Sequence, residues 1–266
     1  MLDAESTVTD ATAVPYTHHK FADTPADHEV IWRYMDLPKF LCLIETRKLH
    51  FAFIYDLPDK WEGVIDRRTT AGIQAVFASA SGSAIDLFRT VHEHMAVNCW
   101  FRGVYESVAM WSLYTKTEYG IAIRTTVGRL KEALAATSMP VYIGAVHYRD
   151  PAVTDGSVLG IGELNVLPPL LQKRPCYQHE CELRAIANFG AEVTLVKGEL
   201  RVHAGAHAGT DVPVDLNALV ESITLAPSFP DWANGIVEGA LKRSGLKPSI
   251  HASDALSSPP SPFLEY

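Results

Sequence analysis

Two glutamates separated by one residue, Glu180 and Glu182, have the residue types and spacing for acid or base chemistry. They lie in a segment, 177–187, that begins polar and ends apolar, and we predict that it forms a β-strand. Alternation along a strand puts Glu180, Glu182 and Arg184 on one face; the other face, the expected core side, takes His179, Cys181 and Leu183. Carboxylates this close repel, so at least one pKa should shift, and such pairs suit proton transfer or stabilisation of a cationic transition state. The alternative is a solvated strand face with Arg184 as counter-ion.

An arginine between two aromatic residues, Arg33 in Trp32-Arg33-Tyr34, is the second candidate. We predict a strand over 30–34, and a partly buried arginine there needs an anionic partner. Its planar fork fits a phosphate or carboxylate group of a ligand. An internal carboxylate such as Glu62 fits as well, and both alternatives stay open.

Aromatic residues on a predicted helix are the third candidate, in the segment Met110-Trp111-Ser112-Leu113-Tyr114. Trp111 and Tyr114 are three residues apart and therefore share a face of the helix. Flat rings in that arrangement could stack on a nucleobase or a nicotinamide ring. Packing in the core is the more common role of such a pair.

No metal site is expected. Cys176, His179 and Cys181 are suitable ligand types, but on a strand His179 and Cys181 face away from Cys176, and zinc needs a fourth group at tetrahedral geometry. The segment Gly160-Ile161-Gly162 lacks the third glycine of a dinucleotide-binding turn.

The segments that must position these side chains mix strands and helices without a regular βαβ alternation. Asp36 is placed to cap a helix with Pro38 in its first turn, and an apolar strand follows at 49–53. Further helical patterns cover about 64–97, 108–114, 126–136 and 232–244. Further strand patterns cover 97–101, 120–125, 141–148 and 222–225, with a hairpin that turns at 197–198. This order predicts an α+β fold with a mixed, mostly antiparallel sheet and flanking helices.

The length and net charge of the chain limit its domain organisation and its partners. It has 266 residues and a formal net charge of −8, which does not suggest bulk binding to nucleic acid or anionic membranes. We predict a flexible tail over 1–28, a single catalytic-type domain over 29–254 and a Pro/Ser-rich tail over 255–266. The four cysteines lack a disulfide-framework spacing, and neither a signal peptide nor a membrane span is evident, so we predict a cytoplasmic protein.

Taken in order, five motifs resemble a bacterial family, domain of unknown function family 2971. The motifs are Trp32-Arg33-Tyr34, Lys48-Leu49-His50-Phe51, Pro58-Asp59-Lys60-Trp61-Glu62-Gly63, Met110 to Tyr114 with Gly120 to Ile123, and Lys173, Tyr177, Glu180, Glu182 and Arg184. The likeness runs from about residue 30 to about residue 254. One departure lies in the third motif, where Lys60 replaces the usual proline.

A more remote resemblance is to ADP-ribosyltransferases of the DNA-modifying toxin type. The shared layout is a strand with an arginine, a helix, a second strand, an aromatic strand and helix, and a late Glu-x-Glu strand. This resemblance implies an ADP-ribosyltransferase-like fold, NAD as substrate without a metal, and transfer of ADP-ribose to a protein or nucleic-acid acceptor. It also implies a bacterial toxin or phage-defence effector, with an inhibitor protein as a further partner and no membrane.

The same resemblance implies roles for individual residues. Glu182 would be the catalytic glutamate and Glu180 would position the acceptor. NAD would be bound by Arg33, Tyr34, Trp111, Ser112 and Tyr114, and substrate would be positioned by Arg184 and Lys173. Two rivals stay open: a carboxylate-dependent hydrolase (a glycosidase or a metal-assisted nuclease), and a non-catalytic module whose acidic strand binds a basic partner. For a transferase, Glu182→Gln should abolish the chemistry and either change stability little or raise it, because a like-charge pair with Glu180 is relieved.

Overall fold

The computed structural model describes the following parts of the chain: Tyr16, His18, 22–64, Ala71, Arg89, 92–150, 167–189, 191–196, 199–204 and 210–257. The helix predicted over 64–97 lies largely outside these residues. None of the described helices is long and apolar enough to cross a membrane.

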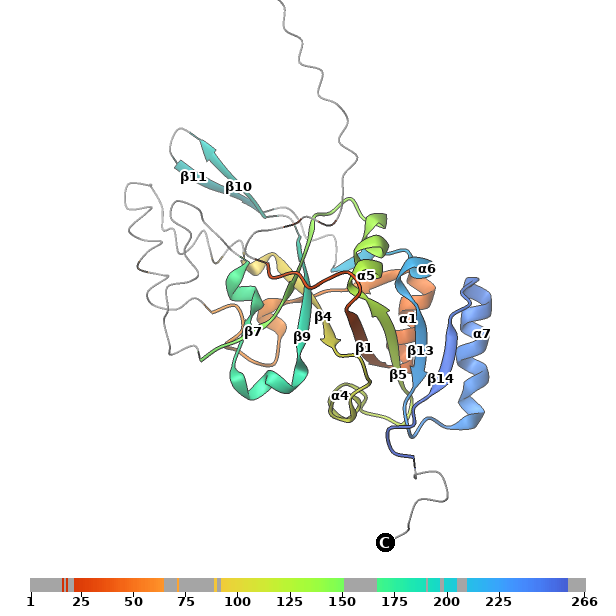
Figure 1. Cartoon of the computed structure of the whole chain (residues 1–266). Coiled ribbons are helices and arrows are strands. Elements are labelled where there is room, and N and C mark those ends of the chain that lie inside the picture. Colours follow the sequence, from red (N-terminus) through yellow and green to blue (C-terminus); the bar gives the residue numbers. More distant parts are fainter. Residues whose placement is uncertain are drawn as a thin grey trace, which may run out of the picture.

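Eight strands of the described residues form one main sheet (Figure 1). Seven follow the order β14-β13-β5-β1-β4-β9-β6, and β3 adds to β4. Their bounds are β1 Val30–Asp36, β3 Ala52–Phe53, β4 Met95–Arg102, β5 Gly120–Thr126, β6 Val141–Ala145, β9 Glu182–Asn188, β13 Ser222–Leu225 and β14 Ser249–Ala252. Within this sheet, β13 and β14 pair in parallel, and the other paired strands are antiparallel. The sheet is therefore mixed and mostly antiparallel, and the predicted α+β class is confirmed.

Three small sheets surround the main one. β2 (Lys48–His50) pairs with β12 (Asp211–Pro213), β7 (His147–Tyr148) with β8 (Gln172–Lys173), and β10 (Ala191–Val196) with β11 (Glu199–Ala204). The predicted strand at 49–53 is thus divided, because β2 pairs with β12 while β3 pairs with β4. The strand predicted at 141–148 likewise separates into β6 and β7.

Helices cover the two faces of the main sheet unequally (Figure 1). One face packs against α1 (Leu37–Thr46), α5 (Val127–Ala133), α6 (Leu216–Leu219) and α7 (Asn234–Ser244). The other face carries α4 (Val108–Tyr114). Short 3-10 helices complete the described elements: η1 Ile54–Asp56, η2 Leu134–Ala136, η3 Pro168–Leu171, η4 Pro175–Glu180 and η5 Asp231–Ala233.

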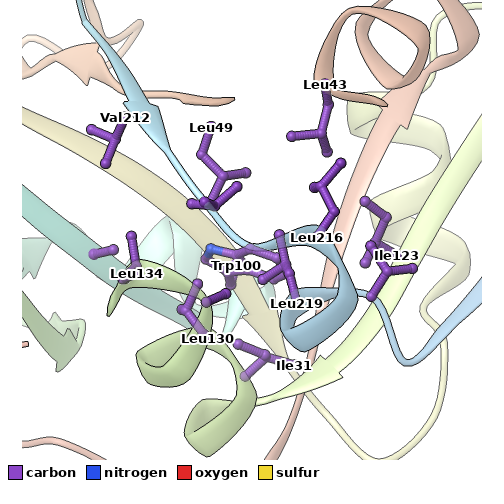
Figure 2. Close-up of a cluster of buried hydrophobic side chains, with 14 of the residues drawn as sticks. Ile31, Leu43, Leu49, Trp100, Ile123, Leu130, Leu134, Val212, Leu216 and Leu219 are labelled. Carbon is purple, nitrogen blue, oxygen red and sulfur yellow. The ribbon is translucent and has the colours of Figure 1, made fainter. Parts of the chain in front are cut away.

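Side chains that alternate along β1 pack into apolar clusters on both faces of the main sheet. Ile31 and Met35 enter the large apolar core, while Trp32 and Tyr34 enter an aromatic cluster beneath α4. Figure 2 shows Ile31 in the large core among leucines from α1, α5 and α6 and beside Trp100 of β4. Because a strand with two apolar faces must lie between two layers, β1 becomes a central strand.

β1 and β4 pair over only two residues before they separate. Their pairs are Ile31 with Arg102 and Trp32 with Phe101, whereas β1 pairs with β5 over its whole length. Farther along, the edge of β4 that β1 has left is taken by β3. A fork therefore opens between β1 and β4 just beyond Trp32.

The segment 22–28, which we expected to be part of a flexible tail, lies on the domain. The Thr24 hydroxyl donates to the Ile143 carbonyl at 2.6 Å, and the Ala145 N–H donates to the Asp23 carbonyl at 2.8 Å. Lys131 forms an ion pair with Asp27 at 2.6 Å. The folded unit therefore begins before residue 29.

The strand predicted over 177–187 is wrong in its first half. Residues Pro175–Glu180 form the 3-10 helix η4, and β9 begins only at Glu182. Cys181, between them, has a φ of 38°, in the left-handed region. This turn leaves His179 and Cys181 exposed, so neither faces the core as we had expected, whereas Leu183 is fully buried.

Candidate functional site

A cleft of about 260 Å³ lies at the fork between β1 and β4. Its aromatic wall is formed by Trp32, Tyr34, Trp100, Phe101 and Tyr114. The charged lining residues are the cations Arg33 and Lys39 and the acids Glu180 and Glu182. The lining is completed by His50, Ala52, Val97, Cys99 and Met110. The volume is near the lower end of small-molecule sites, roughly 300–1,000 Å³.

The two glutamates meet in the cleft although η4 and β9 are different elements. The Lys173 ammonium lies 2.7 Å from Glu180 Oε2 and 3.2 Å from Glu182 Oε2. The Tyr114 hydroxyl donates to Glu180 Oε2 at 3.1 Å. The left-handed turn at Cys181 therefore brings together two carboxylates that a continuous strand would have placed two positions apart on one flat face.

Arg184 lies beneath Glu182 and is fully buried. Its Nε and Nη2 donate to the two oxygens of Glu182 at 2.9 and 3.0 Å, and its Nη1 donates to the Leu170 carbonyl at 2.6 Å. Nη2 also bonds to Glu62. The alternative of a solvated strand face is therefore wrong, since Glu180, Glu182 and Arg184 are at most 6% exposed.

The charged neighbours decide the ionisation of Glu182. Burial alone would raise its pKa, but Arg184 and then Lys173 outweigh burial and lower the pKa of Glu182 to about 2. Burial opposes the charge of Lys173 as well, yet Glu182 and Glu62 raise the pKa of Lys173. Glu182 is thus a fixed anion at neutral pH, suited to stabilising positive charge and poorly suited to accepting a proton.

Arg33 is a partly buried cation of the cleft. Its Nη1 donates to the Cys99 carbonyl at 2.6 Å, and its guanidinium lies 5.9 Å from the centroid of the Trp100 ring. Within the described residues it forms no ion pair, and Glu62, the internal partner we had considered, contacts Arg184 and Lys173 instead. A guanidinium has five donors, so Arg33 can offer several to an anionic ligand.

The predicted aromatic residues divide into two groups. Tyr34 and Tyr114 line the cleft. Trp111 is absent from the lining: it is buried with its ring edge-on to Tyr34, 4.8 Å between centroids, and its indole N–H donates to Glu106 at 2.7 Å. The Ser112 side chain is exposed and donates to the Val108 carbonyl of its own helix. Trp111 therefore supports the wall, and Ser112 lies away from it.

Lys173 and Arg184, predicted to position substrate, hold the glutamates from behind and do not line the cleft. Nine of the fourteen lining residues were not predicted as site residues, and Lys39, His50 and Cys99 are the ones among them that carry titratable side chains. Burial and the adjacent Glu182 raise the pKa of the Cys99 thiol, so it stays neutral beside the carboxylate. Nothing in the local pattern of β4 distinguishes Cys99 from an ordinary core residue.

A second cavity, of about 590 Å³, reaches Glu182 as well. Its lining is His28, Glu29, Val30, Arg102, Gly103, Val104, Val146, Tyr148, Gln178, Cys181 and Glu182. The backbone N–H of Glu182 donates to the Tyr148 hydroxyl at 2.8 Å, which fixes the start of β9 at this cavity. Of the predicted site residues, Glu182 is the one that lines both cavities.

No protein-family model matches the chain, and no curated protein matches it in sequence. The resemblance to domain of unknown function family 2971 therefore stays a prediction. Two solved structures of DarT from Thermus sp. 2.9 are similar to the chain, each with a TM-score of 0.39. The complex with ADP-ribosylated ssDNA is 12% identical and covers 87% of this chain and 97% of its own; the complex with NAD+ is 11% identical, with 86% and 97% covered. Likeness this remote assigns neither an activity nor a site to this chain.

Proposed function

We propose that this chain is an NAD-dependent ADP-ribosyltransferase-like enzyme that acts on a macromolecular acceptor. The observation that carries the proposal is that Arg33 and Glu182, 149 positions apart, line one aromatic cleft. NAD carries an anionic diphosphate and a cationic nicotinamide joined to ribose. Arg33, without an ion pair among the described residues, complements the first, and the fixed anion Glu182 complements the second.

The chemistry follows from that complementarity. Breaking the bond between ribose C1′ and the nicotinamide nitrogen sends the electron pair to nicotinamide, which leaves neutral, and positive charge develops at the sugar. Glu182 would stabilise that charge, as a carboxylate does in glycoside hydrolysis. An O–H or N–H group of the acceptor then bonds to C1′ and gives its proton to solvent. Lys39, at the same cleft, adds a second cation for the diphosphate.

Two substrates need two approaches to one reacting centre. In this proposal NAD occupies the cleft at the fork, and the acceptor approaches through the second cavity, because Glu182 lines both. Glu180, held by Lys173 and Tyr114 beside Glu182, would position the acceptor. The acceptor class is left to the experiment, in which single-stranded DNA, RNA and a protein extract are offered separately.

The test compares wild type with Glu182→Gln for nicotinamide release and for transfer of labelled ADP-ribose. We expect the variant to lose roughly 100-fold or more of the rate, the effect of removing a preorganised electrostatic group. Our expectation that stability would hardly change is not compatible with the structure, since Glu182 pairs with Arg184 through both oxygens. Rates are therefore compared per folded molecule. An inactive wild type with all three acceptors would contradict the proposal.

A further inference from the structure

Glu62 lies behind the acidic wall of the cleft, from a turn that is more than 110 positions upstream of η4. Its side chain is only 2% exposed, and it is absent from the cleft lining. Its Oε2 accepts from Arg184 Nη2, and its Oε1 lies 3.5 Å from the Lys173 ammonium. Both cations that hold Glu182 are therefore also held by Glu62.

The charges of this cluster do not balance. Three carboxylates, Glu62, Glu180 and Glu182, share two cations, Lys173 and Arg184, which leaves one formal negative charge in excess. Without the Glu62 carboxylate the count would be even, and both cations would be free to neutralise Glu182 more completely. The Glu182 carboxylate would then attract a positive charge in the cleft less strongly.

We propose that Glu62 is a positioning residue that sets the orientation and the uncompensated charge of Glu182 through Arg184 and Lys173. This inference rests on the proposed function, in which Glu182 stabilises the developing positive charge. It makes Glu62 a part of the site, although Glu62 does not line the cleft.

Asp59, three residues before Glu62, forms an ion pair that is separate from the cluster around Glu182. Arg174 donates to both oxygens of Asp59, at 3.0 and 2.9 Å, and Asp59 is 4% exposed. Asp59 and Glu62 are therefore matched: both are buried carboxylates of one turn, and each is paired with an arginine. They differ in that only the arginine of Glu62, Arg184, also contacts Glu182.

The matched pair gives the experiment its control. Glu62→Gln and Asp59→Asn are purified and compared with wild type for thermal melting and for nicotinamide release over a range of NAD concentrations. We expect Glu62→Gln to lower kcat roughly 10- to 100-fold, the cost of a slightly misplaced group, and to change KM much less. Asp59→Asn should melt at a lower temperature and keep the wild-type kcat. Equal kcat in wild type and Glu62→Gln, or an equal loss in both variants, would overturn the inference.

A second readout is independent of catalysis. The carboxyl carbon of Glu182 is followed by NMR in side-chain-labelled protein, assigned with Glu182→Gln. We expect its resonance and titration to change in Glu62→Gln and to stay as in wild type in Asp59→Asn. If wild type releases no nicotinamide, the proposed function is wrong. The NMR measurement still shows whether Glu62 controls the environment of Glu182. An unchanged Glu182 resonance in Glu62→Gln would overturn the Glu62 inference alone.

Discussion

The two halves of the main sheet bury very different side chains at the same depth. On the side of β5, β13 and α5, residues such as Ile123 and Leu130 are 0% exposed (Figure 2). On the side of β4 and β9, Arg184 is also 0% exposed, within a cluster of five charged groups. Apolar burial stabilises a fold directly, whereas buried ion pairs roughly break even against apolar groups of similar size. Stability therefore accounts for the first half, and a chemical role is the better account of the second.

Removing the central cation should have the largest effect. Arg184→Met leaves Glu182 and Glu62 buried without their guanidinium, and we expect a loss of about 3–5 kcal/mol in the free energy of unfolding. The matched control is Arg124→Met, whose partly exposed pair with Glu221 is worth about 1 kcal/mol or less. Urea unfolding of both variants measures the difference. If the two variants lost similar free energies of unfolding, burial of the charged cluster would matter little for stability.

A truncation in the apolar half should separate stability from chemistry. Leu130→Ala opens a cavity in the large core, and we expect it to lose about 2–5 kcal/mol. Because Leu130 does not line the cleft, nicotinamide release per folded molecule should match wild type. If Leu130→Ala lost rate well below its melting temperature, the distinction between a stabilising half and a chemical half would be wrong.

Acid should weaken the charged half selectively. The pKa of Glu182 is lowered from 4.5 to about 2, so its ionised form stabilises the fold fully above about pH 4.5 and loses that contribution as the pH falls to about 2. At 1.36 kcal/mol per pKa unit the effect is at most about 3 kcal/mol. Burial raises the pKa of Glu62, whose contribution has the opposite sign and reduces the net loss. Unfolding free energies at pH 5 and pH 3 should fall less in Glu182→Gln than in wild type; equal falls would exclude Glu182 as the cause.

The same comparison explains what could be predicted from the sequence. In the apolar half, local periodicity was sufficient: the strand begun at Val30 and the helix Val108–Tyr114 are confirmed, since alternation and helical spacing reflect contacts within a few residues. In the charged half, Pro175 begins a 3-10 helix and Cys181 takes a left-handed conformation, so that Glu180 can reach Tyr114 and Lys173. That requirement is tertiary, and no local pattern encodes it.

The site residues show a similar division. Motif resemblance named five residues that do line the cleft: Arg33, Tyr34, Tyr114, Glu180 and Glu182. Their chemical roles stay predictions. The sequence could not predict which arginine pairs with Glu62. Arg184 lies 122 positions away, and any buried arginine would have been an equally good partner. Cys99, on β4, lines the cleft because β1 and β4 separate beyond Trp32, which is a property of strand pairing.

A crystal structure of Glu182→Gln soaked with NAD tests the central claim most directly, since the variant should bind NAD without cleaving it. The account predicts NAD at the fork between β1 and β4, with the diphosphate against the Arg33 guanidinium and the nicotinamide-bearing ribose beside residue 182. NAD bound outside this cleft, or bound in it with the ribose turned away from residue 182 and no contact to Arg33, would contradict the account.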